Sequence, residues 1–243
     1  MNNKNTAPMK PALLKIEQLR PFEGHPYKVQ DNEEMTALSE SIRESGILSP
    51  LIVRPAGENE YEVISGHRRL YAARKAGLTE VPVLICTLDR DAAAIALVDS
   101  NLHREHILPS EKAFAYKLKM EALAHQGIAC GQVGHKSRDV ISDTDSGRQV
   151  QRYIRLTYLI PELLEKMDKE EIAFSVGVEL SYLDEYSQQD VLEQCEINDC
   201  TPSYSQAWRM HKADREGLLT RDVIQFIMSE KKPNQRETVK IPT

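Results

Sequence analysis

The spacing of apolar residues divides the chain into an N-terminal part that mixes strand and helix patterns and a longer part that is almost wholly helical. Up to about residue 88, short β-rich runs such as "PLIVRP" and "YEVIS" alternate with amphipathic stretches such as "DNEEMTALSESIRESG". In that amphipathic stretch, Met35, Leu38 and Ile42 form one apolar stripe, and Gly46 suits the C-terminal cap of a helix. The order strand, helix, strand, strand, helix, strand predicts a compact α/β unit.

Beyond this unit, "DAAAIALVDSNL" and "PSEKAFAYKLKMEALAHQG" predict regular helices, and short amphipathic helices follow from "PELLEKM" to "TRDVIQFIMSE". The segment "SGRQVQRYIRL" predicts a basic helix capped by Ser146, with Val150, Ile154 and either Leu156 or Tyr158 on its inner face. The predicted fold class is therefore α+β, a small N-terminal α/β domain followed by an all-α domain. We expect a disordered N-terminus over residues 1–12 and the α/β domain over residues 13–100. A helical domain over residues 101–200 and C-terminal helices with a tail over residues 201–243 would follow.

Charge is segregated along the chain, although the formal total is only −6. Residues 161–200 contain twelve acidic side chains and two lysines, whereas residues 201–243 contain eight basic and five acidic side chains. Local fields decide binding, so the acidic average does not exclude a nucleic-acid partner. No apolar run reaches the roughly 18 residues that cross a bilayer, and the four cysteines lack zinc-site spacing. We therefore expect a cytoplasmic protein.

The stretch "ISGHRRLYAARKAGL" places Arg68 and Arg69 in the first turn of an expected helix, directly after Gly66. Unpaired N–H groups at a helix start favour an anion, whereas cations there oppose the helix dipole. Such local conflicts are typical of functional sites. The stretch indicates either an anion site or arginines that pair with carboxylates of neighbouring helices, and charge alone does not separate the two.

A second polar group lies in "VDSNLHREHILPSEKAFAY", which joins two predicted helices and contains Asn101, Arg104 and Glu105. An amide, a guanidinium and a carboxylate together can supply a Mg²⁺ ligand and a phosphate clamp. By itself, the spacing Asn-x-x-Arg is a weak motif.

Three segments of the chain resemble, in the same order, the signature regions of ParB-type partition proteins. They are "LRPFEGHPYKVQDNEEMTALSESIRESGILSPLIVRP", "YEVISGHRRLYAARKAGLTEVPVLI" and "SNLHREHILPSEKAFAY". The resemblance is strong over residues 16–124 and continues more loosely to about residue 183. It implies a ParB/sulfiredoxin-like nucleotide-binding domain followed by a helix-turn-helix domain. Proteins of this family bind CTP with Mg²⁺, recognise a centromere-like DNA site and close into a sliding clamp.

The resemblance also implies which residues bind the nucleotide. Residues 46–54 would surround the base and phosphates, Arg68 and Arg69 would contact the triphosphate, and Asn101 would be the metal ligand beside the phosphate contact Arg104. The full set expected to bind nucleotide is Gly66, His67, Arg68, Arg69, Asn101, Arg104 and Glu105.

Two residues depart from the family pattern, because His67 and Ser100 stand where the family has glutamates. Histidine cannot replace a carboxylate as metal ligand or base at the same reach. We therefore expect CTP binding and assign no catalytic residue, and whether CTP is hydrolysed stays open.

The segment "SRDVISDTDSGRQVQRYIRLTYL" fits a helix-turn-helix whose second helix reads DNA. Arginine and glutamine read guanine and adenine in the major groove, and arginines farther along such a helix meet phosphates. The alternative is an ordinary amphipathic helix with a solvated basic face. The candidate DNA-binding residues are Arg148, Gln149, Gln151, Arg152 and Arg155.

The leading hypothesis is a CTP-responsive DNA-binding protein that acts in partitioning of a plasmid, mobile element or chromosome. Its expected partners are double-stranded DNA, a second copy of the chain and a ParA-type ATPase, without a membrane, and it would be associated with the nucleoid or a plasmid. The family's C-terminal dimerisation domain is not apparent before Thr243. The alternatives are a DNA-binding adaptor that has lost nucleotide use and a nucleotide-dependent kinase on the same fold. A kinase requires a carboxylate beside the triphosphate, which position 67 does not supply.

Overall fold

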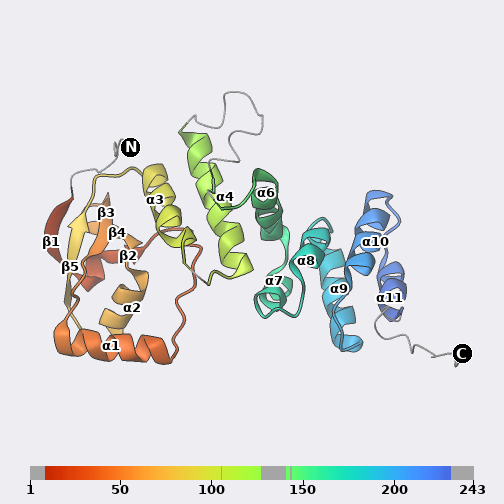
Figure 1. Ribbon diagram of the computed structural model, residues 1–243, viewed down its shortest axis with the longest axis horizontal. Helices are drawn as coiled ribbons and strands as arrows, with labels where there is room; N and C mark the ends of the chain where they lie inside the picture. Colours follow the sequence, from red (N-terminus) through yellow and green to blue (C-terminus); the bar gives the residue numbers. More distant parts are fainter. Residues whose placement is uncertain (1–8, 105, 127–140, 143, 231–243) are drawn as a thin grey trace, which may run out of the picture. The chain divides into compact units, whose positions relative to one another are not determined.

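The computed structural model describes residues 9–104, 106–126, 141–142 and 144–230 (Figure 1). The chain divides into two compact units, one formed by Met1–Ile107 with Phe114–Asp143 and the other by Leu108–Ala113 with Thr144–Thr243. Helix α4 (Pro109–His125) contributes residues to both units. The α+β class predicted from the sequence is confirmed, because a mixed sheet with helices precedes a helical unit.

The first unit is built on a five-stranded sheet with the order β1-β5-β3-β4-β2. Its strands are β1 (Lys10–Lys15), β2 (Leu19–Pro21), β3 (Leu51–Gly57), β4 (Glu60–Ser65) and β5 (Glu80–Ile85). The pairs β1–β5 and β3–β4 are antiparallel, whereas β2–β4 and β3–β5 are parallel. Strands β2 and β4 therefore end at the same edge of the sheet.

Alternate residues of the central strands face two separate cores, as the period of two in a strand requires. Val53 and Val63 pack with residues of α1 and α2, whereas Ile64 packs with Leu97 of α3. The helices are α1 (Glu33–Ser45), α2 (His67–Lys75) and α3 (Arg90–Leu102). The predicted cap at Gly46 is confirmed, because this residue ends α1 with a φ of 70°. Helices thus cover both faces of the sheet (Figure 1).

The N-terminal boundary differs from the expected one at residue 13. Strand β1 begins at Lys10, and residues 10–12, expected to be disordered, pair with β5. After β1, the first strand of the predicted order, a 3₁₀ turn at Ile16–Gln18 leads into β2. Residues 1–8 lie outside the described part of the chain.

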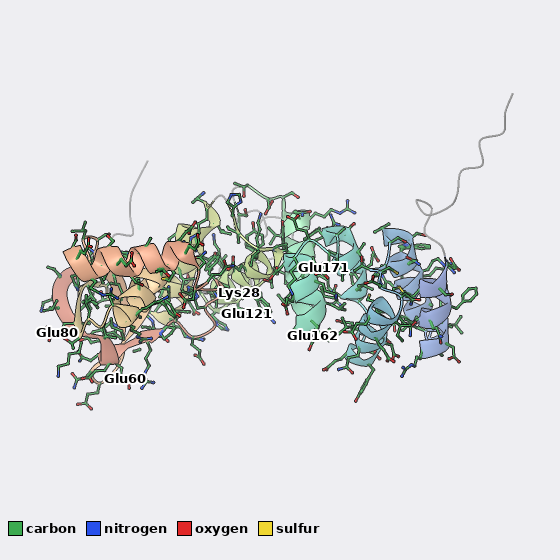
Figure 2. All side chains as sticks on the ribbon, turned by 90° about the horizontal axis from the view of Figure 1, so that it is seen from below. Lys28, Glu60, Glu80, Glu121, Glu162 and Glu171 are labelled. Carbon is green, nitrogen blue, oxygen red and sulfur yellow. The ribbon has the colours of Figure 1, made fainter. Side chains whose placement is uncertain are left out.

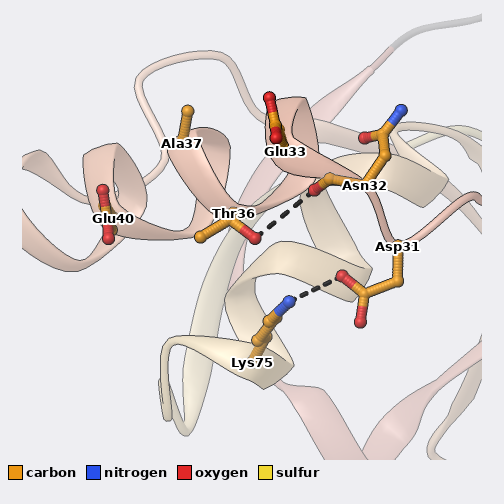
Figure 3. Close-up of a pocket in the computed structure, with 7 residues that line it drawn as sticks. All are labelled: Asp31, Asn32, Glu33, Thr36, Ala37, Glu40 and Lys75. Atoms are coloured by element: carbon orange, nitrogen blue, oxygen red, sulfur yellow. Dashed lines mark hydrogen bonds and ion pairs between the residues drawn. The ribbon is translucent and has the colours of Figure 1, made fainter.

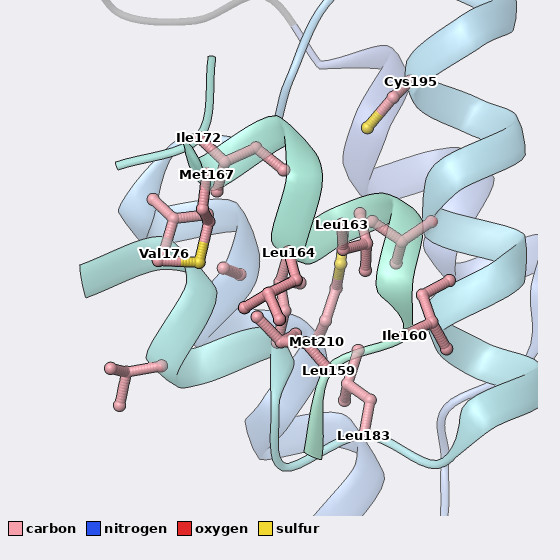
Figure 4. Packing of buried hydrophobic residues seen from close by; sticks show 14 of the residues in the cluster. Leu159, Ile160, Leu163, Leu164, Met167, Ile172, Val176, Leu183, Cys195 and Met210 are labelled. Atoms are coloured by element: carbon pink, nitrogen blue, oxygen red, sulfur yellow. The ribbon is translucent and has the colours of Figure 1, made fainter. Parts of the chain in front are cut away.

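The second unit is helical. It contains α6 (Gly147–Arg155), a 3₁₀ turn (Leu156–Tyr158), α7 (Pro161–Asp168), α8 (Phe174–Leu180), α9 (Glu185–Ile197), α10 (Tyr204–Arg215) and α11 (Arg221–Ser229). Leu163, Met210 and Ile224 belong to one core of buried residues, part of which Figure 4 shows. Helices α10 and α11 therefore share the core of the helices before them, and the expected boundary at residue 200 does not divide it.

The acidic stretch of residues 161–200 lies within this unit. Glu162 and Glu171, for example, are exposed and labelled in Figure 2. Among the described residues, no helix is both long enough and apolar enough to cross a membrane.

Gly177 of α8 is tightly packed, because an added Cβ would lie 2.1 Å from the Sδ atom of Met167. Met167 is 2% exposed, so it has little room to move. Alanine gains about 1 kcal/mol over glycine in an open helix, whereas overpacking a core costs about 1–3 kcal/mol. We therefore expect Gly177→Ala to lower the free energy of unfolding by about 1–2 kcal/mol in chemical denaturation.

The control is Gln189→Ala, at an exposed position of α9, which should change stability by less than about 0.5 kcal/mol. In a Met167→Ala background the clash is absent, and Gly177→Ala should then be neutral or stabilising. An equal loss in both backgrounds would contradict this packing.

Candidate nucleotide and DNA-binding sites

The turn between β4 and α2 is formed by Gly66, whose φ of 106° and ψ of 22° lie in the left-handed region. A Cβ there would lie 3.0 Å from Leu51 Cγ and 3.1 Å from Arg69 Nη2, so both backbone and space favour glycine. No side chain caps α2, and its first turn contains no acidic residue. The first N–H groups of a helix have no intrahelical partner, so this helix start offers donors to an anion.

The basic residues of α2 are held in different ways. Arg68 Nη2 lies 2.9 Å from Glu34 Oε2 in an ion pair whose side chains are 46% and 73% exposed. Arg69 Nη1 donates to the carbonyls of Ser49 and, at 2.8 Å, Pro50. The sequence left open whether these arginines bind an anion or pair with carboxylates of neighbouring helices. The second alternative is observed for Arg68, whose partner Glu34 belongs to α1. An exposed ion pair contributes about 0–1 kcal/mol, so a triphosphate can compete with Glu34 for Arg68.

The other two basic residues of α2 lie at its far end. Arg74 Nη2 donates to the carbonyl of Leu19 at 2.8 Å, and Lys75 Nζ lies 2.6 Å from Asp31 Oδ1. Both therefore have structural partners away from the start of the helix.

Three segments bring a second group of polar side chains to the start of α2. The rings of His25 and His67 have centroids 3.7 Å apart and are tilted by 40°. Arg104 Cζ lies 5.4 Å from the ring centroid of Tyr27, whose ring contacts His25 edge-on at 5.6 Å. Strands β2 and β4 are parallel and therefore end at the same edge of the sheet. The loop after β2 carries His25, and β4 leads through Gly66 to His67, so the two histidines meet at this edge.

Burial keeps the imidazole of His67 neutral by lowering its pKa to about 3, and the nearby positive charges of His25 and Arg104 add to this effect. A hydrogen bond with the backbone of Val63 acts in the opposite direction. The pKa of His25 is also lowered, chiefly by burial, with Arg104 as a further cause. His67 Nε2 is buried and has no hydrogen-bond partner among the described residues.

Asn101, the expected metal ligand, is 6% exposed near the end of α3. Its Nδ2 donates to the Leu97 carbonyl at 2.7 Å and to Ser100 Oγ at 3.3 Å. These contacts occupy the amide nitrogen, so the amide oxygen is the atom that suits Mg²⁺. Mg²⁺ is commonly held by one or two carboxylates together with substrate phosphates, and in kinases an asparagine is one of the ligands, so Asn101 can supply one oxygen beside the phosphates. Groups of three or more His, Cys, Asp or Glu that could hold a metal alone are absent from the described residues.

Of the residues expected to bind nucleotide, Gly66, His67 and Arg68 lie together at the start of α2, and Arg104 acts on His67 from the segment after α3. Glu105 lies outside the described residues. The sequence reading missed His25 and Tyr27, whose only signal was their place in the turn-like stretch "PFEGHPYKV".

An open hollow of about 540 Å³ lies between α1 and the far end of α2 (Figure 3). Its charged lining consists of Asp31, Glu33, Glu40 and Lys75, and the lysine already pairs with Asp31. The excess of carboxylates repels phosphate, so this hollow is not the nucleotide site.

The predicted basic helix is present as α6. Ser146 caps it by accepting a hydrogen bond from the Gln149 N–H at 3.3 Å, and Val150 is fully buried. Leu156 is buried, whereas Tyr158 is 59% exposed, so Leu156 is the inward-facing residue of the two. The expected first helix of the pair falls largely in residues 127–140, outside the described part of the chain.

The candidate DNA-binding residues of α6 differ in their surroundings. Arg148 is exposed, and Gln149 is partly exposed near the helix start. Arg152 contacts Gln149 Oε1 at 3.4 Å, and its Cζ lies 4.9 Å from the Phe174 ring centroid. Gln151 is partly buried. The first turn of α6 is therefore its most accessible part.

Arg155 is enclosed by other residues of the second unit. Its Nη2 donates to the Ser181 carbonyl at 2.6 Å, and its Cζ lies 4.4 Å from the Tyr158 ring and 4.3 Å from the Tyr182 ring. Tyr182 stacks in turn on His211 of α10 at 4.2 Å. These contacts favour a role for Arg155 in fixing α6 against α8 and α10.

Comparison with known proteins identifies relatives of this chain. The ParB N-terminal domain model matches residues 2–102. The chain is 39% identical over 160 residues to the chromosome-partitioning protein Spo0J of Thermus thermophilus, covering 65% of this chain and 55% of that protein. It is 30% identical over 226 residues to the probable chromosome-partitioning protein ParB of Neisseria meningitidis, covering 92% of this chain and 70% of that protein. The chain spans about half the length of several of the curated relatives that it matches.

Among solved structures, a C-terminally truncated chromosome-partitioning protein ParB from Caulobacter crescentus, complexed to the centromeric parS site, matches with 23% identity and a TM-score of 0.46. The match covers 83% of this chain and 98% of that one. The structure has a sheet domain with an uncapped helix start at α2, followed by a helical unit with the capped basic helix α6. The chain belongs to the ParB family of chromosome-partitioning proteins.

The buried, neutral imidazole of His67 makes stability depend on pH. Its folded-state pKa of about 3 lies below the ordinary value of 6.5, so the unfolded chain binds a proton that the folded chain does not. Stability is therefore retained above pH 6.5 and lost as the pH falls below it. Between pH 7 and pH 5, we expect the wild type to lose about 1–2 kcal/mol more free energy of unfolding than His67→Gln in urea denaturation.

The control is His125→Gln, which removes a histidine whose side chain is 66% exposed and should leave the pH dependence close to that of the wild type. Equal losses for the wild type and His67→Gln would show that His67 is not held neutral.

Proposed function

We propose that this protein is a CTP-responsive, sequence-specific DNA-binding protein that acts in partitioning of a chromosome, plasmid or mobile element. Nucleotide binding is supported by the start of α2, where a left-handed glycine precedes uncapped N–H groups and Arg68. His67 lies at the same helix start, and Arg104 is close enough to act on its pKa. The site is positively charged at a helix N-terminus, the arrangement that binds phosphate groups. Membership of the ParB family supports the same function.

The residues at this site have distinct roles in the proposal. The N–H groups after Gly66 and the side chains of Arg68 and Arg104 hold the phosphates. Arg69 adds positive charge while it fixes the Ser49 and Pro50 carbonyls, and so joins α2 to the segment before β3. Asn101 supplies an amide oxygen to Mg²⁺, which screens the phosphate charge when bound.

The proposal covers binding and not fast hydrolysis. Positions 67 and 100 hold histidine and serine, neither of which supplies a carboxylate base. The imidazole of His67 is also surrounded by positive rather than negative charge.

DNA recognition is assigned to α6. Arg148 and Gln149, near its capped start, meet base edges, and Gln151 and Arg152 contribute contacts farther along. Arg155, which the sequence placed among the DNA contacts, instead positions the helix in this proposal through Ser181, Tyr158 and Tyr182. Self-association and a ParA-type ATPase complete the proposed partners, and the protein would be located on the nucleoid or a plasmid.

A DNA-binding adaptor without nucleotide is the second candidate. It is favoured by the contacts of Arg68 with Glu34 and of Arg69 with two carbonyls, which satisfy both arginines without a phosphate.

Calorimetric titration with CTP and Mg²⁺ separates the two candidates. We expect the wild type to bind and Arg68→Ala to bind at least tenfold more weakly, because a charge-assisted hydrogen bond contributes about 1.5–3 kcal/mol. Arg43→Ala, at an exposed position of α1, is the matched control and should bind like the wild type. Absence of binding by the wild type, with and without DNA, would contradict the proposal and favour the adaptor.

Selection from a random DNA library, followed by affinity measurements, tests the role of α6. We expect Arg148→Ala and Gln149→Ala to relax the preference at particular base pairs, each by about 1–3 kcal/mol. Arg155→Met should weaken binding to all sequences alike and lower the thermal stability. Arg221→Ala on α11 is the control, and an unchanged base preference in the Arg148 and Gln149 variants would exclude α6 as the reading helix.

A further inference from the structure

No role has been assigned to the contact between the two imidazoles at the start of α2, although His67 belongs to the residues expected to bind nucleotide. His25 comes from the loop after β2, and His67 is the first residue of α2. We propose that His25 and His67 are a further phosphate-binding pair, which takes up a proton when CTP·Mg²⁺ binds, so that nucleotide affinity rises as the pH falls. This inference rests on the proposed nucleotide function and specifies how the same site is regulated.

The geometry gives the pair a free donor position. The ring centroids lie 3.7 Å apart, and His67 Nε2 is buried without a hydrogen-bond partner among the described residues. The ring already bonds the Val63 backbone, so a buried Nε2 without a partner is costly, and once it is protonated a bound phosphate oxygen can accept a hydrogen bond from it. Neutral imidazole carries one N–H, whereas the protonated ring donates from both nitrogens. Protonation therefore increases the number of donors available to phosphate.

The charges that act on His67 come from several segments. His25 and Tyr27 lie in the loop after β2, Arg104 follows α3, and the Val63 backbone of β4 contacts the ring. On its own helix, Arg68 and Arg69 follow directly. Within the described part of the chain, none of the groups that influence the pKa of His67 is a carboxylate. Any proton placed on the pair in the free protein therefore meets burial and positive charge.

A bound triphosphate reverses this balance. An opposite charge within about 4–6 Å shifts a pKa by about one to three pH units toward the charged form. Such a shift from about 3 brings the pKa of His67 toward 6, and the pKa of His25 would rise as well. Two protons on rings in contact would repel, so the pair takes up one proton.

The sign of the pH dependence follows from the difference in pKa of the histidine pair between the free and the nucleotide-bound protein. The nucleotide-bound protein binds more protons than the free protein, so lower pH favours the bound form. Near pH 8 the pair is neutral in both states and contributes no pH dependence. The effect grows as the pH falls from about 7 toward 5, where the bound pair titrates and the free pair does not.

Titration of the full chain with CTP·Mg²⁺ at pH 6, 7 and 8, in two buffers of different ionisation enthalpy, tests the inference. We expect net proton uptake at pH 6. The ratio of wild-type to His67→Gln affinity should be about twofold larger at pH 6 than at pH 8, the increase expected for a bound pKa near 6. Using this ratio cancels the titration of the nucleotide itself. His25→Gln should act like His67→Gln, whereas His125→Gln should act like the wild type.

The possible failures are distinguishable. The proposed role of the histidine pair would be overturned if the wild type bound CTP without proton uptake at pH 6. It would also be overturned if the ratio of wild-type to His67→Gln affinity did not change with pH. Either result would leave the proposed nucleotide function intact. No CTP binding at any pH would overturn both. Proton uptake by the wild type is measured without a variant, so the test does not depend on the folding of His67→Gln.

Discussion

The left-handed turn at Gly66 is the local constraint on which the candidate site depends. It reverses the chain from β4 into α2 in a conformation and space that favour glycine, and it leaves the first N–H groups of the helix without a side-chain cap. The parallel pairing of β2 with β4 then brings the loop that carries His25 to the same sheet edge. Positive charge gathers there because α2 supplies Arg68 and Arg69 and the segment after α3 supplies Arg104. Burial, with the charges of His25 and Arg104 as further causes, keeps His67 neutral by lowering its pKa.

The packing of the first unit fixes this edge in place. Alternate residues of β3 and β4 fill two cores, so the helices on both faces hold the strands that end at the site. Arg69 extends this restraint, because its contacts with the Ser49 and Pro50 carbonyls join the start of α2 to the start of β3. A site built on strand ends and a helix start is more rigid than one built on loops alone, which suits recognition of a flexible triphosphate.

Local patterns in the sequence were sufficient for the features that depend on near neighbours. The cap at Ser146, the end of α1 at Gly46 and the basic start of α2 all follow from residues within one or two turns. His25 was beyond such patterns, because its contact with His67 depends on the pairing of strands far apart in the sequence. The predicted DNA contact of Arg155 stays a prediction, and the periodicity of α6 alone does not reveal that the Tyr158 and Tyr182 rings lie against its guanidinium. Long-range contacts thus decide which of the basic residues are accessible.

The central claim is that nucleotide phosphates bind at the start of α2, and NMR spectra recorded during titration with CTP·Mg²⁺ test it most directly. The account predicts that the largest shifts occur at the backbone amides of His67, Arg68 and Arg69 and at the imidazole nitrogens of His25 and His67. The amides of residues 31–40 beside the acidic hollow should change little. Shifts concentrated at that hollow, or an unchanged spectrum at saturating nucleotide, would contradict it.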